Sequence, residues 1–81
     1  MEYEIEISPR ARKDLKKLDR KIVDRILSKI AEMTNDLAGD VKRLTEFEPE
    51  YRLRVGDFRI LFDIENSKII VRRIKNRREA Y

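Results

Sequence analysis

The sequence contains neither cysteine nor histidine. Without cysteine the chain can form no disulfide and has no thiol nucleophile, and without both residue types it lacks the usual ligands of zinc and other transition metals. We therefore expect no metal site. Any proton transfer would have to use lysine, arginine, tyrosine, aspartate or glutamate.

Long apolar runs are also missing. No stretch is long enough to span a membrane, and the N-terminus lacks the basic-then-apolar pattern of a signal peptide. These absences predict a cytoplasmic location and no membrane partner. The 81 residues suffice for one domain but not for two, and a hydrophobic content of 41% supports a modest core. We expect a single domain over residues 1–81.

Charge is abundant and unevenly distributed. Charged residues make up 44% of the chain, and the formal net charge is +4. Residues 1–49 carry 11 basic and 11 acidic side chains, whereas residues 50–81 carry 9 basic and 5 acidic ones, so the net charge belongs to the C-terminal part. A localised basic region is typical of proteins that bind nucleic acids or other polyanions, and a solvated basic edge is the alternative.

A strand and a short helix are expected first. Residues 3–7 alternate large apolar and acidic side chains, the period of two that predicts a half-buried strand. Ser8 and Pro9 follow, and these residue types favour the N-cap and the first turn of a helix. The helical spacing of apolar residues continues to about Leu18, which predicts a short amphipathic helix.

A second helix begins near Asp19, a residue type that caps helices. Its apolar residues form one wide stripe, which indicates burial against a sheet rather than a membrane or cofactor face. The stripe consists of Ile22, Val23, Ile26, Leu27, Ile30 and Met33. The short link between the helices predicts an antiparallel helical hairpin. Residues 35–50 are expected to be mostly loop, anchored by Val41, Leu44 and Phe47.

A β-hairpin is expected over residues 51–64. Its two halves alternate apolar and polar side chains, and Gly56 with Asp57 suits a two-residue turn that has glycine first. After another turn near residues 65–67, a last strand spans about 68–75. The element order is β-α-α-β-β-β, which is an α+β fold.

The hairpin turn determines where three arginines point. It places Arg54 directly across from Arg59, and Arg52 shares their face, which is turned away from the helices. Like charges directly opposite one another destabilise a sheet by about 0.2–1 kcal/mol, so three guanidinium groups on one open face suggest that an anion completes the site. Arginine suits phosphate because its planar fork donates two parallel hydrogen bonds. Asp57, Asp63 or a tail could neutralise the arginines instead.

The last strand leads into a basic run at residues 72–81, which ends at Tyr81. If this strand lies beside the hairpin, its basic side chains join the arginine face or its rim, where a phenol could stack on a base or move a proton. A frayed basic tail is the alternative. A two-residue turn at Asn66 and Ser67 would point Arg73 toward the helices, so a β-bulge or a shifted turn is expected here.

The sequence of residues 51–62, YRLRVGDFRILF, resembles the central hairpin of the RelE branch of the RelE/ParE toxin superfamily. The Ser8–Pro9 helix start, the helix pair and the closing residues 77–81 match in order and spacing, so the resemblance covers essentially the whole chain. It implies a single RelE-like toxin domain, with a curved four-stranded sheet packed against a helical hairpin. It also implies a metal-independent endoribonuclease without a cofactor, which cuts mRNA on the ribosome and has a cognate antitoxin as its partner.

The resemblance further implies a mechanism and the residues that carry it. The ribose 2′-hydroxyl attacks the adjacent phosphate, which leaves a cyclic phosphate and a free 5′-hydroxyl. Arg59 would stabilise the pentavalent phosphate, Arg77 would lie near the leaving group, and Tyr81 would stack on or orient the substrate. RNA would be bound by Arg52, Arg54 and Arg78.

Two departures from the family pattern concern proton transfer. Many relatives carry a histidine at or beside Asn76, which this chain lacks. Arg52 and Arg54 replace lysines of some active members, and arginine is a poor general base because it stays protonated. Lys75 and Tyr81 are then the most available proton carriers, and Glu46 and Glu48 are less favoured candidates. Two other functions stay open: a ParE-like toxin that inhibits DNA gyrase by binding, and a catalytically degenerate module that binds RNA or an antitoxin.

Overall fold

The computed structural model describes residues 2–44 and 49–76. The elements in these ranges are β1 (Glu4–Ile7), α1 (Pro9–Lys16), α2 (Arg20–Glu32), β2 (Asp40–Arg43), β3 (Tyr51–Val55), β4 (Phe58–Glu65) and β5 (Lys68–Asn76). The α+β class expected from the sequence is confirmed. The sheet has five strands rather than the expected four.

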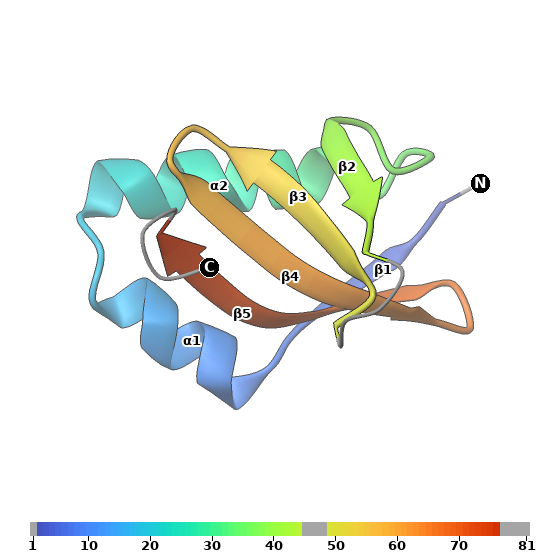
Figure 1. Cartoon of the computed structure of the whole chain (residues 1–81), viewed down its shortest axis with the longest axis horizontal. Helices are drawn as coiled ribbons and strands as arrows, with labels where there is room; N and C mark the ends of the chain where they lie inside the picture. Colours follow the sequence, from blue (N-terminus) through green and yellow to red (C-terminus); the bar gives the residue numbers. More distant parts are fainter. Residues whose placement is uncertain (1, 45–48, 77–81) are drawn as a thin grey trace.

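All the strands form one sheet in the order β1-β5-β4-β3-β2 (Figure 1). Strand β1 is parallel to β5, and the other neighbouring pairs are antiparallel. The first strand of the chain therefore lies beside the last one. The hairpin of β3 and β4 occupies the middle of the sheet, which places its side chains at the centre of both faces.

Strand β2 lies where the sequence predicted mostly loop. Only Val41 of its residues is apolar, so its alternation is too weak to predict a strand. The strand forms because it pairs with the edge of the sheet at β3. Val41 pairs with Leu53 and packs against the core. Of the other expected anchors, Leu44 is half-buried, and Phe47 lies outside the described residues.

One face of the sheet is covered by α2, and the core lies between them (Figure 1). The largest fully buried side chains are Phe62, Ile26, Ile30, Met33, Leu53, Ile60, Ile69 and Val71. The helical stripe is thus confirmed at its centre, whereas Leu27 is 37% exposed. Helix α1 lies beside β5 instead of over the middle of the sheet, and its Ala11 is buried there. Neither helix of the described residues covers the opposite face of the sheet.

Ser8 begins α1 as the sequence predicted. Its hydroxyl accepts a hydrogen bond from the backbone N–H of Ala11 and donates one to the carbonyl of Arg72. The same residue therefore caps the helix and joins it to β5. Asp19 occupies the N-cap position of α2, but its side chain makes no capping hydrogen bond.

Candidate functional site

The turn at Gly56 and Asp57 sets the register of β3 against β4. Gly56 has a φ of +57°, in the left-handed region that favours glycine, and Asp57 does not have a positive φ. This is the arrangement expected for a turn with glycine first. Arg54 pairs directly with Arg59. The register predicted from the sequence is confirmed.

Strand β5 contains the β-bulge that the sequence predicted. Phe62 of β4 pairs with Val71, but the preceding Leu61 pairs with Arg73, so Arg72 has no partner in the register. The extra residue reverses the alternation of β5. As a result Arg73 shares the face of Leu61, on the side away from the core, instead of facing the helices.

The register arranges basic side chains in two rows that cross the strands on the uncovered side of the sheet. We call this surface the basic face. Its first row, from β2 to β5, consists of Asp40, Arg54, Arg59 and Lys75. Its second row consists of Lys42, Arg52, Leu61 and Arg73. Neighbouring strands lie about 4.8 Å apart, so the three cations of the first row extend over about 10 Å.

Arg52 and Arg73 of the second row are paired with carboxylates, whereas Lys42 of the same row has no ion-pair partner in the described part of the chain. In the second row, Arg52 has a side chain that is only 13% exposed, and its Nη1 lies 3.6 Å from Asp40 Oδ1 and donates to the Asp40 carbonyl over 3.2 Å. In the first row, neither Arg54 nor Lys75 has an ion-pair partner among residues 2–44 and 49–76. Arg54 is exposed and Lys75 is half-buried.

Asp14 of α1 neutralises the second-row Arg73 and also binds the backbone of β5. Its Oδ2 accepts hydrogen bonds from Arg73 Nε and from the N–H of Ile74, both over 2.9 Å. Burial of the carboxyl group raises its pKa, but the hydrogen bonds from Arg73 and Ile74 and the charges of Arg73 and Arg10 outweigh this effect. The pKa of Asp14 therefore lies below its ordinary value of 3.8, and the group is ionised at neutral pH.

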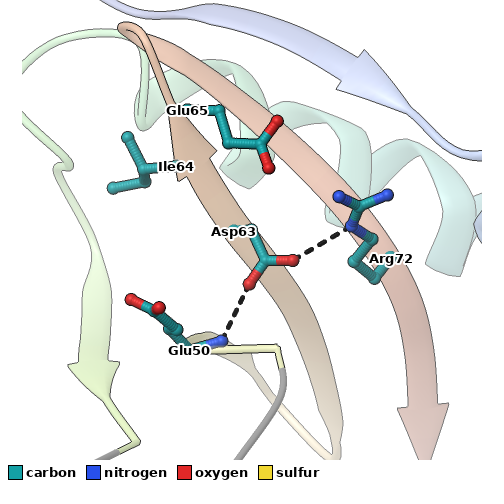
Figure 2. Close-up of a pocket in the computed structure, with 5 residues that line it drawn as sticks. All are labelled: Glu50, Asp63, Ile64, Glu65 and Arg72. Carbon is teal, nitrogen blue, oxygen red and sulfur yellow. Dashed lines mark hydrogen bonds and ion pairs between the residues drawn. The ribbon is translucent and has the colours of Figure 1, made fainter.

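Asp63 neutralises the bulge residue. Its Oδ2 accepts from Arg72 Nε over 3.0 Å, and its Oδ1 accepts from the backbone N–H of Glu50 over 2.9 Å (Figure 2). The sequence left open that Asp63 neutralises the three hairpin arginines, but its ion-pair partner in the described residues is Arg72 of β5. A hollow of about 280 Å³ here is lined by Glu50, Asp63, Ile64, Glu65 and Arg72. Because it contains three carboxylates, this hollow does not suit a phosphate.

The structure brings together three of the site residues expected from the sequence: Arg54, Arg59 and Lys75 stand side by side in the first row. Arg52 lies in the second row. The other expected site residues, Arg77, Arg78 and Tyr81, lie outside the described residues. Sequence reasoning expected the basic run that contains Arg73 on this face or its rim, but it missed Asp40 and Lys42 of the face, and Asp14 beside it.

The described ranges contain no group of three or more histidine, cysteine, aspartate or glutamate residues that could hold a metal ion. In the same part of the chain, no helix is long and apolar enough to cross a membrane.

Comparisons with known proteins agree on one family. The family model described as "ParE toxin of type II toxin-antitoxin system, parDE" matches residues 5–81. Toxin RelE3 of Methanocaldococcus jannaschii is 36% identical over 74 residues, which cover 85% of this chain and 84% of the relative. Putative toxin RelE1 of the same organism is 33% identical over 87 residues of alignment, covering 100% of this chain and 97% of the relative.

Solved structures share the fold. The chain matches a RelB–RelE antitoxin–toxin complex from Methanococcus jannaschii with a TM-score of 0.77 and 32% identity, over 93% of both chains. It matches the archaeal RelE–RelB complex from Pyrococcus horikoshii with a TM-score of 0.78 and 25% identity, over 99% of this chain and 100% of that chain. The chain therefore belongs to the RelE/ParE toxin superfamily, in which it is a RelE-type toxin.

Proposed function

We propose that this toxin of a type II toxin–antitoxin pair is a metal-independent endoribonuclease that cuts ribosome-bound mRNA. The observation that carries the proposal is the first row of the basic face, in which Arg54, Arg59 and Lys75 occupy directly neighbouring positions on three strands. Like charges in such positions repel one another. A polyanion lying across the row removes this repulsion, and RNA supplies one phosphate per nucleotide.

The proposed chemistry needs electrostatic stabilisation rather than a metal. When a 2′-hydroxyl attacks the adjacent phosphate, negative charge builds up on the phosphate oxygens in the transition state, and positioned cations stabilise that state more than the ground state. Arg59 stands at the centre of the row, between Arg54 and Lys75. From the family resemblance we assign Arg59 to the pentavalent phosphate, and we assign Lys75 to proton transfer because the chain has no histidine.

The remaining assignments come from the family resemblance. Arg77 is assigned to the leaving group and Tyr81 to stacking on or orienting the substrate. RNA binding is assigned to Arg52, Arg54 and Arg78. We also propose a cognate antitoxin as a partner, because the solved relatives include RelB–RelE and RelE–RelB complexes. The free toxin would act in the cytoplasm, with mRNA and the ribosome as its partners and no small-molecule cofactor.

A ParE-like toxin that inhibits DNA gyrase by binding is the second candidate. The observation in its favour is the family model, which is that of a ParE toxin. A catalytically degenerate binding module is the third candidate, since the chain has no histidine. Neither alternative cleaves RNA, and the binding module would need the basic face.

Primer extension on mRNA from programmed ribosomes, after addition of the purified toxin, tests the proposal. We expect discrete cuts within codons, and we expect Arg59→Ala to reduce cutting at least about 100-fold, as for the loss of one transition-state donor. Arg20→Ala, which removes one exposed arginine at the start of α2, is the matched control and should cut like the wild type. Circular dichroism establishes that both variants are folded.

The other outcomes separate the alternatives. Intact mRNA together with growth arrest in cells would favour the gyrase-inhibiting toxin. Intact mRNA without growth arrest would favour the degenerate module. Cutting that survives in a folded Arg59→Ala protein would reject the proposed site while leaving the activity in place.

A further inference from the structure

We infer that Asp14 of α1 is a positioning residue for Lys75, which it holds in place through the backbone of β5. The inference rests on the proposed function, in which Lys75 transfers a proton. It adds a residue of a helix to a site that is otherwise built on the sheet. The carboxylate of Asp14 binds the two residues that directly precede Lys75, namely Arg73 and Ile74.

The C-terminal half of β5 has a neighbouring strand on one side only. Strand β1 runs beside β5 as far as the pair of Ile7 and Val71, and beyond that pair only β4 continues alongside (Figure 1). Residues 72–76 therefore have an outer edge to which no strand of the described residues is bonded. Backbone at such an edge opens locally more easily than backbone inside a sheet.

Helix α1 and its N-cap take the place of the missing strand. The N–H of Ser8 donates to the carbonyl of Val71 over 2.9 Å, and the Ser8 hydroxyl donates to the carbonyl of Arg72 over 3.1 Å. Further along the same edge, Asp14 Oδ2 accepts a hydrogen bond from the N–H of Ile74 over 2.9 Å. Asp14 thus continues the hydrogen bonding of β5 past the end of β1.

The carboxylate of Asp14 is itself firmly held. Its side chain is only 10% exposed, and its two oxygens lie 2.9 Å and 3.5 Å from Nε and Nη2 of Arg73. The strand is therefore fixed by a side chain at Arg73 and by its backbone at Ile74. Lys75 follows directly and pairs with Arg59 on β4, so the bond at Ile74 limits how far Lys75 can shift from the proposed phosphate site.

The space next to this bond is not filled by the protein. A hollow of about 240 Å³ lies beside Asp14 and Ile74, and its lining includes Leu18, Phe58 and Asn76. If the bond to Asp14 is lost, the end of β5 has room to move into this hollow. A shift of about 1 Å in a reacting group can lower a rate about 100-fold. Asp14 therefore matters for the rate of the reaction although it does not touch the substrate.

Single-turnover cutting of mRNA on programmed ribosomes tests the inference, with the toxin varied up to saturation. We expect Asp14→Ala to lower the maximal rate by about 10- to 100-fold, because Lys75 is displaced. The toxin concentration that gives half of this rate should change by less than about twofold, since Asp14 makes no contact with the substrate. Circular dichroism at the assay temperature verifies that each variant is folded.

Ser8→Ala is the matched control. It removes a hydrogen bond between the same helix and the same strand, but at Arg72, and it leaves the bond between Asp14 and Ile74 in place. We expect its maximal rate to stay within about twofold of the wild type. An equal fall in both variants would mean that any loosening of α1 lowers the rate, and this would overturn the inference.

A double-mutant cycle with Lys75→Ala separates positioning from a general loss of structure. Lys75→Ala alone should lower the maximal rate by about 100-fold or more, as for the loss of a proton carrier. If Asp14 acts through Lys75, adding Asp14→Ala to this variant should lower the rate by less than about twofold further. Losses that multiply would show that Asp14 acts independently of Lys75.

Hydrogen exchange measured by NMR reports on the backbone without any activity. We expect the amide of Ile74 to exchange at least about 10-fold faster in Asp14→Ala than in the wild type, and to keep its wild-type rate in Ser8→Ala. Unchanged protection of Ile74 in Asp14→Ala would overturn the inference, because the strand would then be held without Asp14.

The outcomes also separate this inference from the proposed function. Discrete cuts by the wild type together with an undiminished rate in Asp14→Ala would leave the nuclease in place and reject the role of Asp14. Cutting by Lys75→Ala at the wild-type rate would reject that role as well, since Lys75 would not be the proton carrier. Intact mRNA with the wild type would reject the nuclease and, with it, a reaction for Asp14 to support.

Discussion

Replacement of Asp14 by asparagine removes the charge that holds α1 to the C-terminal half of β5. Hydrogen bonds to a charged group contribute about 1.5–3 kcal/mol, and the loss of one partner of a fully buried ion pair costs about 3–5 kcal/mol. The Arg73 side chain is 29% exposed, so water can solvate it after the change. We therefore expect the free energy of unfolding to fall by about 2 kcal/mol, and Tm by about 8–16 °C.

Urea unfolding followed by circular dichroism measures this loss. Asp24→Asn makes the same change at an exposed position of α2 and should alter the free energy of unfolding by less than about 0.5 kcal/mol. The pKa of Asp14 is lower in the folded than in the unfolded chain. Its contribution is therefore complete above about pH 4 and is lost as the pH falls through the folded-state pKa.

The difference between the wild type and Asp14→Asn should accordingly narrow when the titration is repeated at decreasing pH below about 4. A difference of less than about 0.5 kcal/mol at pH 7 would refute the energetic role of the ion pair. A large difference that persists unchanged in strong acid would refute its assignment to the charge of the carboxylate.

Two further predictions concern the elements that position the basic face. Gly56→Ala adds a Cβ at a residue with a φ of +57°, and this Cβ would lie 3.2 Å from Arg25 Nη1. We expect thermal unfolding to show that the free energy of unfolding falls by about 1–2 kcal/mol. An unchanged Tm would contradict this. Ser8→Ala removes the hydroxyl bonded to Ala11 and Arg72, which should cost about 1–2 kcal/mol in urea unfolding. Ser8→Thr keeps the hydroxyl, and an equal loss in that variant would argue against the bonds.

The hairpin could be predicted residue by residue because the information that determines it is local. The period of two assigns each side chain to a face, and the two-residue turn at Gly56 assigns the partners, so Arg54 had to stand opposite Arg59. An irregularity in β5 could be predicted from the positive charge of Arg73. Without it, the guanidinium group of Arg73 would have pointed into an apolar core.

The partners of the cations could not be predicted because they depend on tertiary placement. Asp14 has the sequence pattern of an ordinary polar residue on a helix, and it meets Arg73 only because α1 lies beside β5, 59 residues further along the chain. Asp40 meets Arg52 only because a mostly charged segment pairs with the edge of β3. The sequence alone therefore identified most of the basic residues of the site, but not which of them form ion pairs within the protein.

The bulge at Arg72 changes which side chains of β5 face the core, from the odd-numbered to the even-numbered ones. Before it, Ile69 and Val71 are buried at odd positions; after it, the even position of Ile74 is buried, and the odd position of Lys75 faces outward. A gain or loss of a single residue in this strand would exchange its core and its cations between the two faces. Such a change would keep both in place only if a further β-bulge absorbed it, as the bulge at Arg72 absorbs one residue in the present strand.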